Sequence, residues 1–474
     1  MMQHFKHIVG LCLAFTLGLT TSAQADTTVI TGGTLIDSAG TGPIADAVMV
    51  IRDGRIQAAG PRTAIELPAD AREIDATGKF IIPGLMDANV HLYLNLDLET
   101  LIKYEGRYQD IIIEGAQLAL KTGQTTVFDT WGPYPALKKA RDMLNSGEAI
   151  GSRIYFAGNI IGFDGPLSAD FREAAAAHVS KAMVSRLNAD WEQDTGRDLM
   201  WMGPDEVRGK VDAYAAKDVD FLKYGASGHV AMEFITFSPR VQKEIVAAGH
   251  AAGKTVQVHT TSTESLDMAI DAGVDILTHC DITGPVKTIP EATLAKMVER
   301  GIPCSIVPIT QRRLDAYIEQ DPNQVMATYQ GIGRKNIANM IKAGVSILLS
   351  TDAGVKSPLL MAESKQPKVD MRTELGEGHF NAFTALEELG MAPLEILRSA
   401  TLNTAKAYKL DGDLGSLEAG KIADLVILDA NPLDAAANYR SIHMVIKDGV
   451  VVDTDALPLA PVVSNQMPPE EAKE

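Results

Sequence analysis

The sequence predicts an α/β fold: a (β/α)8 TIM barrel with a small composite β-sandwich domain formed by both termini. The middle of the chain alternates apolar strand-like segments with amphipathic helical stretches such as "SPRVQKEIVAAGHAAGK", the pattern of βα repeats around a parallel sheet. The two ends have a different texture, with short strands and Gly or Asp turns in "DAVMVIRDGRIQAAG" and "HMVIKDGVVVD". Because the ends resemble each other and differ from the middle, we expect them to pair in one small domain.

The chain begins with a segment typical of exported proteins. "MMQHFKHIVGLCLAFTLGLTTSAQA" has a basic start, an apolar run and a small-residue end, which predicts a secretory signal peptide cleaved before Asp26. The apolar run is too short to span a membrane and no later segment reaches that length, so the mature protein is expected to be periplasmic or secreted. The predicted parts are the signal peptide (1–25), the N-terminal part of the small domain (26–82), the barrel (83–407), the C-terminal part of the small domain (408–456) and a flexible tail rich in Pro and Glu (457–474).

Composition limits the kinds of partner. With 474 residues, 46% hydrophobic and 22% charged, the chain is an ordinary globular sequence with room for a large core. A formal net charge of -18 argues against nucleic acid or an anionic membrane surface as a partner, and no basic run offsets it. The expected partner is therefore a small-molecule substrate.

Two cysteines remain after removal of the signal peptide, Cys280 and Cys304. An oxidising compartment permits a disulfide between them. Both lie in apolar, strand-like contexts, where a free cysteine behaves as a small hydrophobic residue. The favoured interpretation is a pair of unpaired buried thiols.

The predicted barrel strands are short, apolar and bounded by turn residues. In chain order they are "FIIPGLMDANVH", "TTVFDTW", "RIYFAG", "DFLKYG", "TVQVH", "DILTHC", "PCSIVPI" and "VSILLSTDAG". The catalytic groups of such a barrel lie at the carboxyl ends of its strands. The polar or ionisable residues that close these apolar segments are Asn89, His91, Lys223, His259, His279 and Asp352.

This set of strand-end residues predicts a metal site. A single histidine is more often a structural residue. Histidines and an aspartate at separate strand ends, however, converge on one point, where they would coordinate a shared divalent metal. Lys223 closes a buried strand, which is costly unless its charge is neutralised. It either reaches a carboxylate or solvent, or has reacted with carbon dioxide to give an anionic carbamate that binds metal.

Several of these segments resemble one known family. The chain resembles the amidohydrolase superfamily, specifically its imidazolonepropionase-like and prolidase-like metal-dependent hydrolases, in "IIPGLMDANVH", "DFLKYGASG", "VQVH", "LTHC" and "LLSTDAG". The C-terminal "ATLNTAKAYKLDGDLGSLEAGKIADLVILDANPL" is similar to the closing segment of that family. The similarity covers nearly the whole mature chain, and the motifs occur in the family's order.

The resemblance implies roles for the strand-end residues. Asn89, His91 and Asp352 would hold one metal and His259 and His279 a second, with a carboxylated Lys223 bridging both. One or two divalent ions per subunit, expected to be zinc, would activate water, and Asp352 would act as general base and then general acid. The implied function is exported hydrolysis of an amide-type bond, in a dipeptide or an N-acyl amino acid. The family also suggests a homo-oligomer.

Asn89 departs from the family pattern, which has a histidine at this position. Its amide oxygen is neutral and suits harder cations better than zinc. Three outcomes are open. Asn89 binds the metal weakly through its oxygen, or the metal site that includes Asn89 is labile. Alternatively, a single metal held by Lys223, His259 and His279 carries out the reaction. Two other functions stay open: the same site could hydrolyse a lactone, ester, carbamate or phosphotriester, or the chain could be a binding protein that lost turnover through Asn89.

Substrate contacts are expected on and beside the loops that follow the strands. Arg312 and Arg313 could pair with a substrate carboxylate, although adjacent arginines also suit a solvated helix start. Rim or structural roles are open for every candidate. The candidates are Tyr93, Trp131, Tyr224, His229, Arg312, Arg313 and His379.

Overall fold

The computed structural model describes residues 27–465 except 41, 95, 230, 285, 286, 322, 359, 360 and 362–364. The predicted signal peptide (1–25) and the last part of the predicted tail (466–474) lie outside the described residues. Within the described ranges, no helix combines the length and the apolar character needed to cross a membrane.

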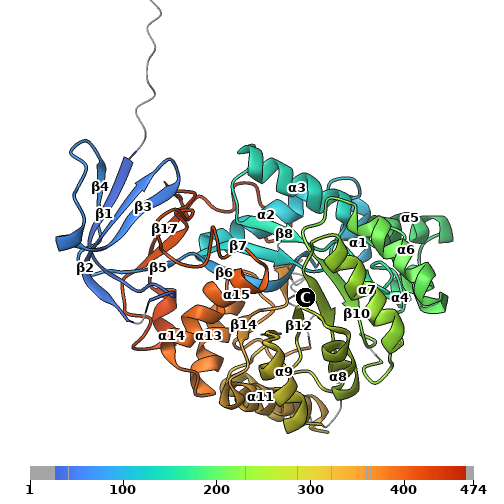
Figure 1. Cartoon of the computed structure of the whole chain (residues 1–474). Helices are drawn as coiled ribbons and strands as arrows, with labels where there is room; N and C mark the ends of the chain where they lie inside the picture. Colours follow the sequence, from blue (N-terminus) through green and yellow to red (C-terminus); the bar gives the residue numbers. More distant parts are fainter. Residues whose placement is uncertain are drawn as a thin grey trace, which may run out of the picture.

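Strands from both ends of the chain form one eight-stranded sheet, at one side of the molecule in Figure 1. Its strands are β1 (Thr27–Leu35), β2 (Ile44–Arg52), β3 (Arg55–Pro61), β4 (Arg72–Asp75), β5 (Phe80–Pro83), β16 (Leu425–Leu428), β17 (Ile442–Lys447) and β18 (Val450–Val451). The C-terminal strand β16 pairs antiparallel with β5, which confirms that the two ends pair. β2 and β3 form a hairpin through Asp53 and Gly54, both with positive φ (52° and 74°), as a two-residue turn requires. The sandwich arrangement and the domain boundaries stay predictions.

The middle of the chain forms parallel strands in two sheets. One contains β9 (Ile160–Ile161), β10 (Leu222–Gly225), β11 (Val256–His259), β12 (Ile276–Thr278), β13 (Cys304–Ile306) and β14 (Ile347–Leu349), and the other β15 (Ala353–Val355), β6 (Leu85–Tyr93), β7 (Gln124–Asp129) and β8 (Arg153–Phe156). Backbone bonds join the two sheets where Asp352 N donates to Asn89 O and where Asp220 N donates to Phe156 O, each 2.9 Å. All the expected strand segments are confirmed, but Phe80–Pro83 belongs to the small-domain sheet. Closure into a complete barrel stays a prediction.

Helices lie around the outside of these parallel strands (Figure 1). They are α1 (Leu98–Lys103), α2 (Tyr108–Lys121), α3 (Tyr134–Ser146), α4 (Glu173–Ala176), α5 (Lys181–Glu192), α6 (Pro204–Ala215), α7 (Pro239–Ala251), α8 (Thr263–Ala272), α9 (Glu291–Arg300), α10 (Gln311–Gln320), α11 (Val325–Ala343), α13 (Gly378–Glu388), α14 (Pro393–Ser399) and α15 (Leu402–Ala407). Helix α7 shows how the sequence starts them: the Ser238 side chain accepts from Val241 N, and Pro239 occupies the first turn. Every residue of β10, β11 and β12 is buried, as expected for parallel strands with helices packed on their outer face.

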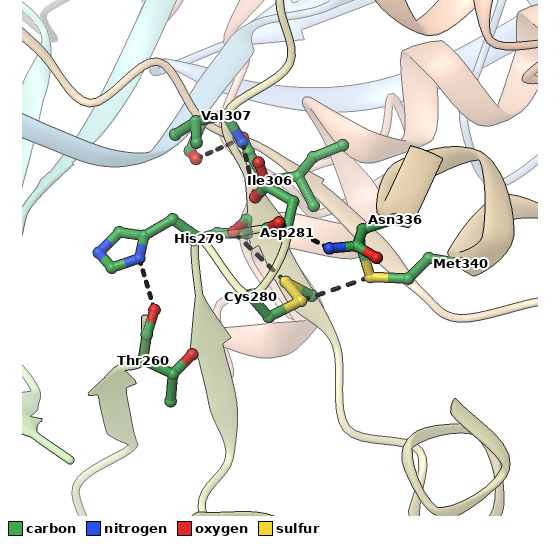
Figure 2. Close-up of a disulfide and its surroundings, with 11 residues drawn as sticks. Thr260, His279, Cys280, Asp281, Ile306, Val307, Asn336 and Met340 are labelled. Carbon is green, nitrogen blue, oxygen red and sulfur yellow. Dashed lines mark hydrogen bonds between the residues drawn. A yellow bond between two sulfur atoms is a disulfide. The ribbon is translucent and has the colours of Figure 1, made fainter. Parts of the chain in front are cut away.

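Cys280 and Cys304 form a disulfide, so the prediction of two free thiols is wrong (Figure 2). The cause is local backbone geometry that hydrophobic periodicity does not report. His279 has a left-handed backbone (φ 40°), and the chain turns there after β12. Cys280 follows this turn and Cys304 begins the neighbouring strand β13, so that their Cα atoms lie 6.2 Å apart, within the span of a disulfide.

The start of the predicted flexible tail is packed against helix α2. Val463 is fully buried. The carboxylate of Glu114, also buried, accepts the backbone N–H groups of Val462, Val463 and Ser464 at 3.0, 2.9 and 2.8 Å. The flexible-tail prediction is therefore wrong for 457–465, because a buried carboxylate distant in sequence supplies acceptors that composition does not reveal.

Replacing Glu114 with alanine is expected to lower the free energy of unfolding by about 2 kcal/mol, since backbone donors bonded to a charged acceptor lose their partner. Urea unfolding measures this change, and limited proteolysis should reveal a new cleavage near 457–465. Asp110→Ala on the same helix, which removes a surface ion pair with Arg107, is the matched control. Equal effects of the two substitutions would contradict the anchoring role of Glu114.

Candidate active site

The predicted strand-end residues meet at the carboxyl ends of the parallel strands. Asn89 and His91 lie in β6, Lys223 lies in β10, His259 ends β11, and His279 and Asp352 follow β12 and β14. All of them except Asn89 line one cavity of about 510 Å³. Asn89 is fully buried directly beside Asp352. The structure thus brings the predicted residues together from distant parts of the sequence.

Asp352 is held at one carboxylate oxygen. Its Oδ1 lies 3.0 Å from His91 Nε2 and accepts from Asn89 Nδ2 at 3.1 Å. Burial raises the pKa of Asp352, but the bond to His91 and the positive charge of Arg372 outweigh burial and hold that pKa well below its usual range. Asp352 is therefore an ionised carboxylate that can accept a proton. Its left-handed backbone (φ 57°), uncommon for a residue other than glycine, is the kind of local strain that functional sites retain.

His259 and His279 form a neutral pair of imidazoles. Their ring centroids lie 4.5 Å apart. His279 Nδ1 lies 3.0 Å from the Thr260 carbonyl oxygen, which only accepts, so Nδ1 carries the hydrogen and Nε2 keeps its lone pair. Burial lowers the pKa of His279 to about 3 and that of His259 well below its usual range. His259 Nε2 is buried and has no hydrogen-bond partner within the described part of the chain.

Lys223 is buried with a single hydrogen-bond partner among the described residues, the hydroxyl of Thr130. Its Nζ donates to Thr130 Oγ1 at 3.0 Å. Burial lowers the pKa of Lys223 to about 8, with the charges of Asp352 and Asp129 opposing the shift. The expected buried environment of this lysine is confirmed.

Sequence reasoning missed two residues that organise this site. Thr130, which follows β7, donates its hydroxyl to Asn89 Oδ1 and accepts from Lys223. Asp87 accepts from the hydroxyl of Thr351 at 2.6 Å and from its backbone N–H at 3.2 Å, which fixes the loop that carries Asp352 to strand β6. Both residues lie in segments predicted as strands. A threonine in such a segment usually reflects strand propensity alone, and an isolated aspartate does not reveal which residue it will bond.

Three of the predicted substrate residues point away from the site, so those predictions are wrong. Tyr224 follows the inward-facing Lys223, so its side chain lies on the other face of β10, where its hydroxyl donates to Gln242 at 3.0 Å. Tyr93 is fully buried against Tyr108, with ring centroids 4.8 Å apart. His379 is buried in α13, with Nε2 3.2 Å from the carbonyl oxygen of Thr122. Among the described residues, the walls of the two cavities at the site do not include these three.

The two arginines do not form a carboxylate clamp. Arg313 donates to the carbonyl oxygens of Pro367 and Val369, both at 2.8 Å, and to the Tyr317 hydroxyl at 3.2 Å. Arg312 is 72% exposed in its side chain and lies 3.6 Å from Asp370. Arg313 lines the first cavity at the site, but these bonds already use its guanidinium donors within the protein, and a contact of either arginine with a substrate carboxylate stays a prediction.

Two cavities meet at the candidate active site and extend in different directions. They share His229, His259, His279, Asp352, Gln366, Arg372 and Thr373. The first, about 480 Å³, has an apolar wall from α10, α11 and nearby loops: Ile282, Ile309, Tyr317, Val325, Met326 and Tyr329. The second, about 510 Å³, is walled by Leu94, Leu96, Trp131, Ile160 and Phe171, with the Trp131 and Phe171 rings stacked 3.9 Å apart. Of the predicted substrate residues, His229 thus lines both cavities and Trp131 the second, and their contact with substrate stays a prediction.

The donor set suits a divalent cation. Within the described ranges, no three His, Cys, Asp or Glu side chains already surround a single point. The side chains present are nevertheless those of a zinc-type site: neutral imidazoles with free lone pairs, one of them without any partner among the described residues, beside an ionised carboxylate. The residues fit the metal that the sequence motifs imply.

Comparison with known proteins identifies the class. The Amidohydrolase family model matches residues 80–452. The chain therefore belongs to the amidohydrolase family, hydrolases that act on carbon–nitrogen bonds and are generally metal-dependent. The resemblance predicted from the strand-end motifs is confirmed.

Individual relatives resemble the chain over nearly its whole length. It is similar to the solved structure of a molinate hydrolase, with 37% identity and a TM-score of 0.88, covering 95% of this chain and 99% of that chain. It is also similar to the structure of phenylurea hydrolase B, with 33% identity and a TM-score of 0.88, covering 93% of this chain and all of that chain. Imidazolonepropionase of Geobacillus sp. (strain WCH70) is 24% identical, with 85% of this chain and 89% of the relative covered.

Proposed function

We propose that this protein is an exported, metal-dependent hydrolase that cleaves an amide-type carbon–nitrogen bond in a small, uncharged substrate with apolar substituents. The observation that carries the proposal is that Asp352, His259 and His279 lie together where two cavities meet, each with an apolar wall. A carbonyl at this junction would have one substituent in each cavity. The Arg313 donors are used within the protein, so Arg313 does not supply the carboxylate contact that the dipeptide and N-acyl amino acid substrates expected from sequence would need.

The similar proteins support an amide-type bond with nitrogen beside the carbonyl. One of them is a phenylurea hydrolase by name, and a phenylurea is an uncharged compound with an apolar ring. The carbamate alternative from the sequence is close to this chemistry, since ureas and carbamates share a carbonyl bonded to nitrogen. A lactone, ester or phosphotriester lacks that bond and is not favoured.

The residues that would hold the cation are His91, Lys223, His259, His279 and Asp352. Bound there, a divalent cation such as zinc supplies an activated water and polarises the substrate carbonyl. Asp352, ionised in this site, takes up a proton and returns it to the leaving nitrogen. Asn89, whose Nδ2 donates to Asp352 Oδ1 at 3.1 Å, holds the carboxylate in place beside the cation ligands.

Lys223 is proposed to carry a carbamate, as the family resemblance implies. Its amine would add to carbon dioxide, forming a nitrogen–carbon bond and releasing one proton, and the anionic product offers two oxygen ligands. Intact-protein mass spectrometry under mild conditions should detect one added carbon dioxide, absent in Lys223→Met. An unmodified Lys223 in metal-loaded protein would contradict this part of the proposal.

Export is proposed on two grounds. The N-terminal segment has the features of a signal peptide, and Cys280 and Cys304 are paired, as cysteines commonly are in oxidising compartments. Periplasmic or secreted localisation is the expected outcome of fractionating cells that express the full chain.

The decisive experiment combines metal analysis with a substrate panel. Plasma emission should find one or two divalent ions per subunit, and chelation should abolish hydrolysis that added zinc restores. Uncharged N-aryl and N-alkyl ureas and carbamates should be cleaved in preference to dipeptides and N-acyl amino acids. Preference for the carboxylate-bearing substrates, or activity unaffected by chelation, would contradict the proposal.

A further inference from the structure

Thr130 lies at the centre of a directional hydrogen-bond chain in the candidate active site. Its side chain is fully buried at the end of β7. The hydroxyl accepts from Lys223 Nζ at 3.0 Å and donates to Asn89 Oδ1. Asn89 Nδ2 in turn donates to Asp352 Oδ1 at 3.1 Å. Three strands, β6, β7 and β10, and the loop after β14 are connected by these bonds.

The direction of the chain follows from the chemistry of its members. Lys223 supplies a hydrogen to Thr130 Oγ1, which leaves the hydroxyl hydrogen for Asn89 Oδ1. The Asn89 amide oxygen therefore accepts from Thr130, which leaves the amide nitrogen to face the Asp352 carboxylate. The reversed amide would set its oxygen against Asp352 Oδ1, which already faces His91 as an acceptor, so two acceptors would face each other. A carbamate on Lys223 keeps one N–H on Nζ, so the chain is compatible with that modification.

We propose that Thr130 is a positioning residue: it orients the Asn89 amide so that Asn89 donates a hydrogen bond to Asp352 instead of ligating the metal through oxygen. Asn89 then differs in role, and not only in strength, from the histidine expected at this position. Both partners of Asp352, Asn89 and His91, meet the same oxygen, so together they set the orientation of the carboxylate. This inference rests on the proposed hydrolytic function.

Thr130→Val and Thr130→Ser form the matched pair for the test. Valine keeps the branched shape and removes the hydroxyl, whereas serine keeps the hydroxyl. With the best substrate of the panel, Thr130→Val is expected to lower kcat about tenfold, which corresponds to about 1.4 kcal/mol of lost transition-state stabilisation, with KM within about twofold. Thr130→Ser is expected to stay within about threefold of the parent, since one hydrogen-bonding hydroxyl replaces another.

A double-mutant cycle with Asn89→Ala tests whether Thr130 acts through Asn89. If it does, the Asn89→Ala, Thr130→Val double variant should have the kcat of Asn89→Ala alone. Multiplying losses in the double variant would overturn the proposal, as would full activity of Thr130→Val or an equal loss in a folded Thr130→Ser. Thermal unfolding reports whether each variant is folded.

Metal content provides a readout that is independent of turnover. Plasma emission of purified Asn89→Ala should show the same metal per subunit as the parent, because Asn89 is not a ligand in this proposal. Loss of metal from Asn89→Ala would overturn it, and this test stands even if Thr130→Val does not fold. Absence of hydrolysis in the parent would count against the proposed function, whereas an active parent with an unaffected Thr130→Val counts against the role of Thr130 alone.

Discussion

Replacing Asp352 with asparagine is expected to lower kcat by about 10³-fold, the middle of the range for losing a general acid–base group. Asparagine keeps the shape of the side chain but cannot take up the proton that the hydrolysis of an amide-type bond must move to the leaving nitrogen. His91 and Arg372 keep the pKa of this carboxylate below the usual range in spite of burial, so Asp352 is ionised and has a free acceptor site for the proton. Steady-state kinetics with the best urea or carbamate substrate measures the loss.

The control for Asp352 is an aspartate of ordinary surroundings. Asp315→Asn on α10 removes a carboxylate whose partner is the Gln311 side-chain amide, and kcat should stay within about twofold, as surface substitutions usually do. Metal content should be measured for both variants. An Asp352→Asn enzyme that keeps its metal and retains more than a tenth of the parent kcat would rule out Asp352 as the proton carrier.

Removing the disulfide, by Cys280→Ser with Cys304→Ser, is expected to lower the free energy of unfolding by about 3 kcal/mol through the loop-closure entropy of the unfolded chain. The two cysteines are 24 residues apart in sequence, and the bond joins the turn after β12 to the start of β13. In a reducing agent, the parent should have the same free energy of unfolding in urea as the double variant. The same reducing agent should leave the double variant unchanged, which is the internal control.

The disulfide also adjoins the candidate site, because Cys280 directly follows His279. Beside it, Asn336 Nδ2 donates to the Asp281 carbonyl oxygen at 2.9 Å and Cys280 Sγ lies 3.4 Å from Met340 Sδ (Figure 2). The Asn336 bond does not involve the cysteine side chains, so it supports the turn that presents His279 independently of the disulfide. A stability change below about 1 kcal/mol would mean that such noncovalent contacts, and not the covalent bond, dominate, since a native disulfide normally contributes about 2–5 kcal/mol.

Much of the candidate site could be predicted because strand ends have a local signature. Apolar runs of a few residues that finish in His259 or Asp352 mark the carboxyl ends of parallel strands, where side chains from separate strands converge. The same signature locates His91, His279 and Lys223. It fails for Tyr224, although strand alternation next to Lys223 already implies the opposite face.

The remaining features depend on partners that are distant in the chain. The sequence leaves Arg313 available to substrate, but the loop containing Pro367 and Val369 takes up its donors. The composition of the tail favours disorder, but Glu114 on α2 binds its backbone. No pattern of spacing or hydrophobicity encodes such a long-range pairing.

Asn89 shows both levels of information. Its identity, a neutral amide where the family resemblance implies a histidine, is visible in "DANVH". Whether an amide presents its oxygen or its nitrogen depends on the neighbouring donors and acceptors. Here Thr130 from β7 and Asp352 after β14 supply them, and these residues are brought to Asn89 by the packing of strands far apart in sequence. Local chemistry therefore determined which residues form the site, and the three-dimensional arrangement determined how their hydrogen bonds are directed.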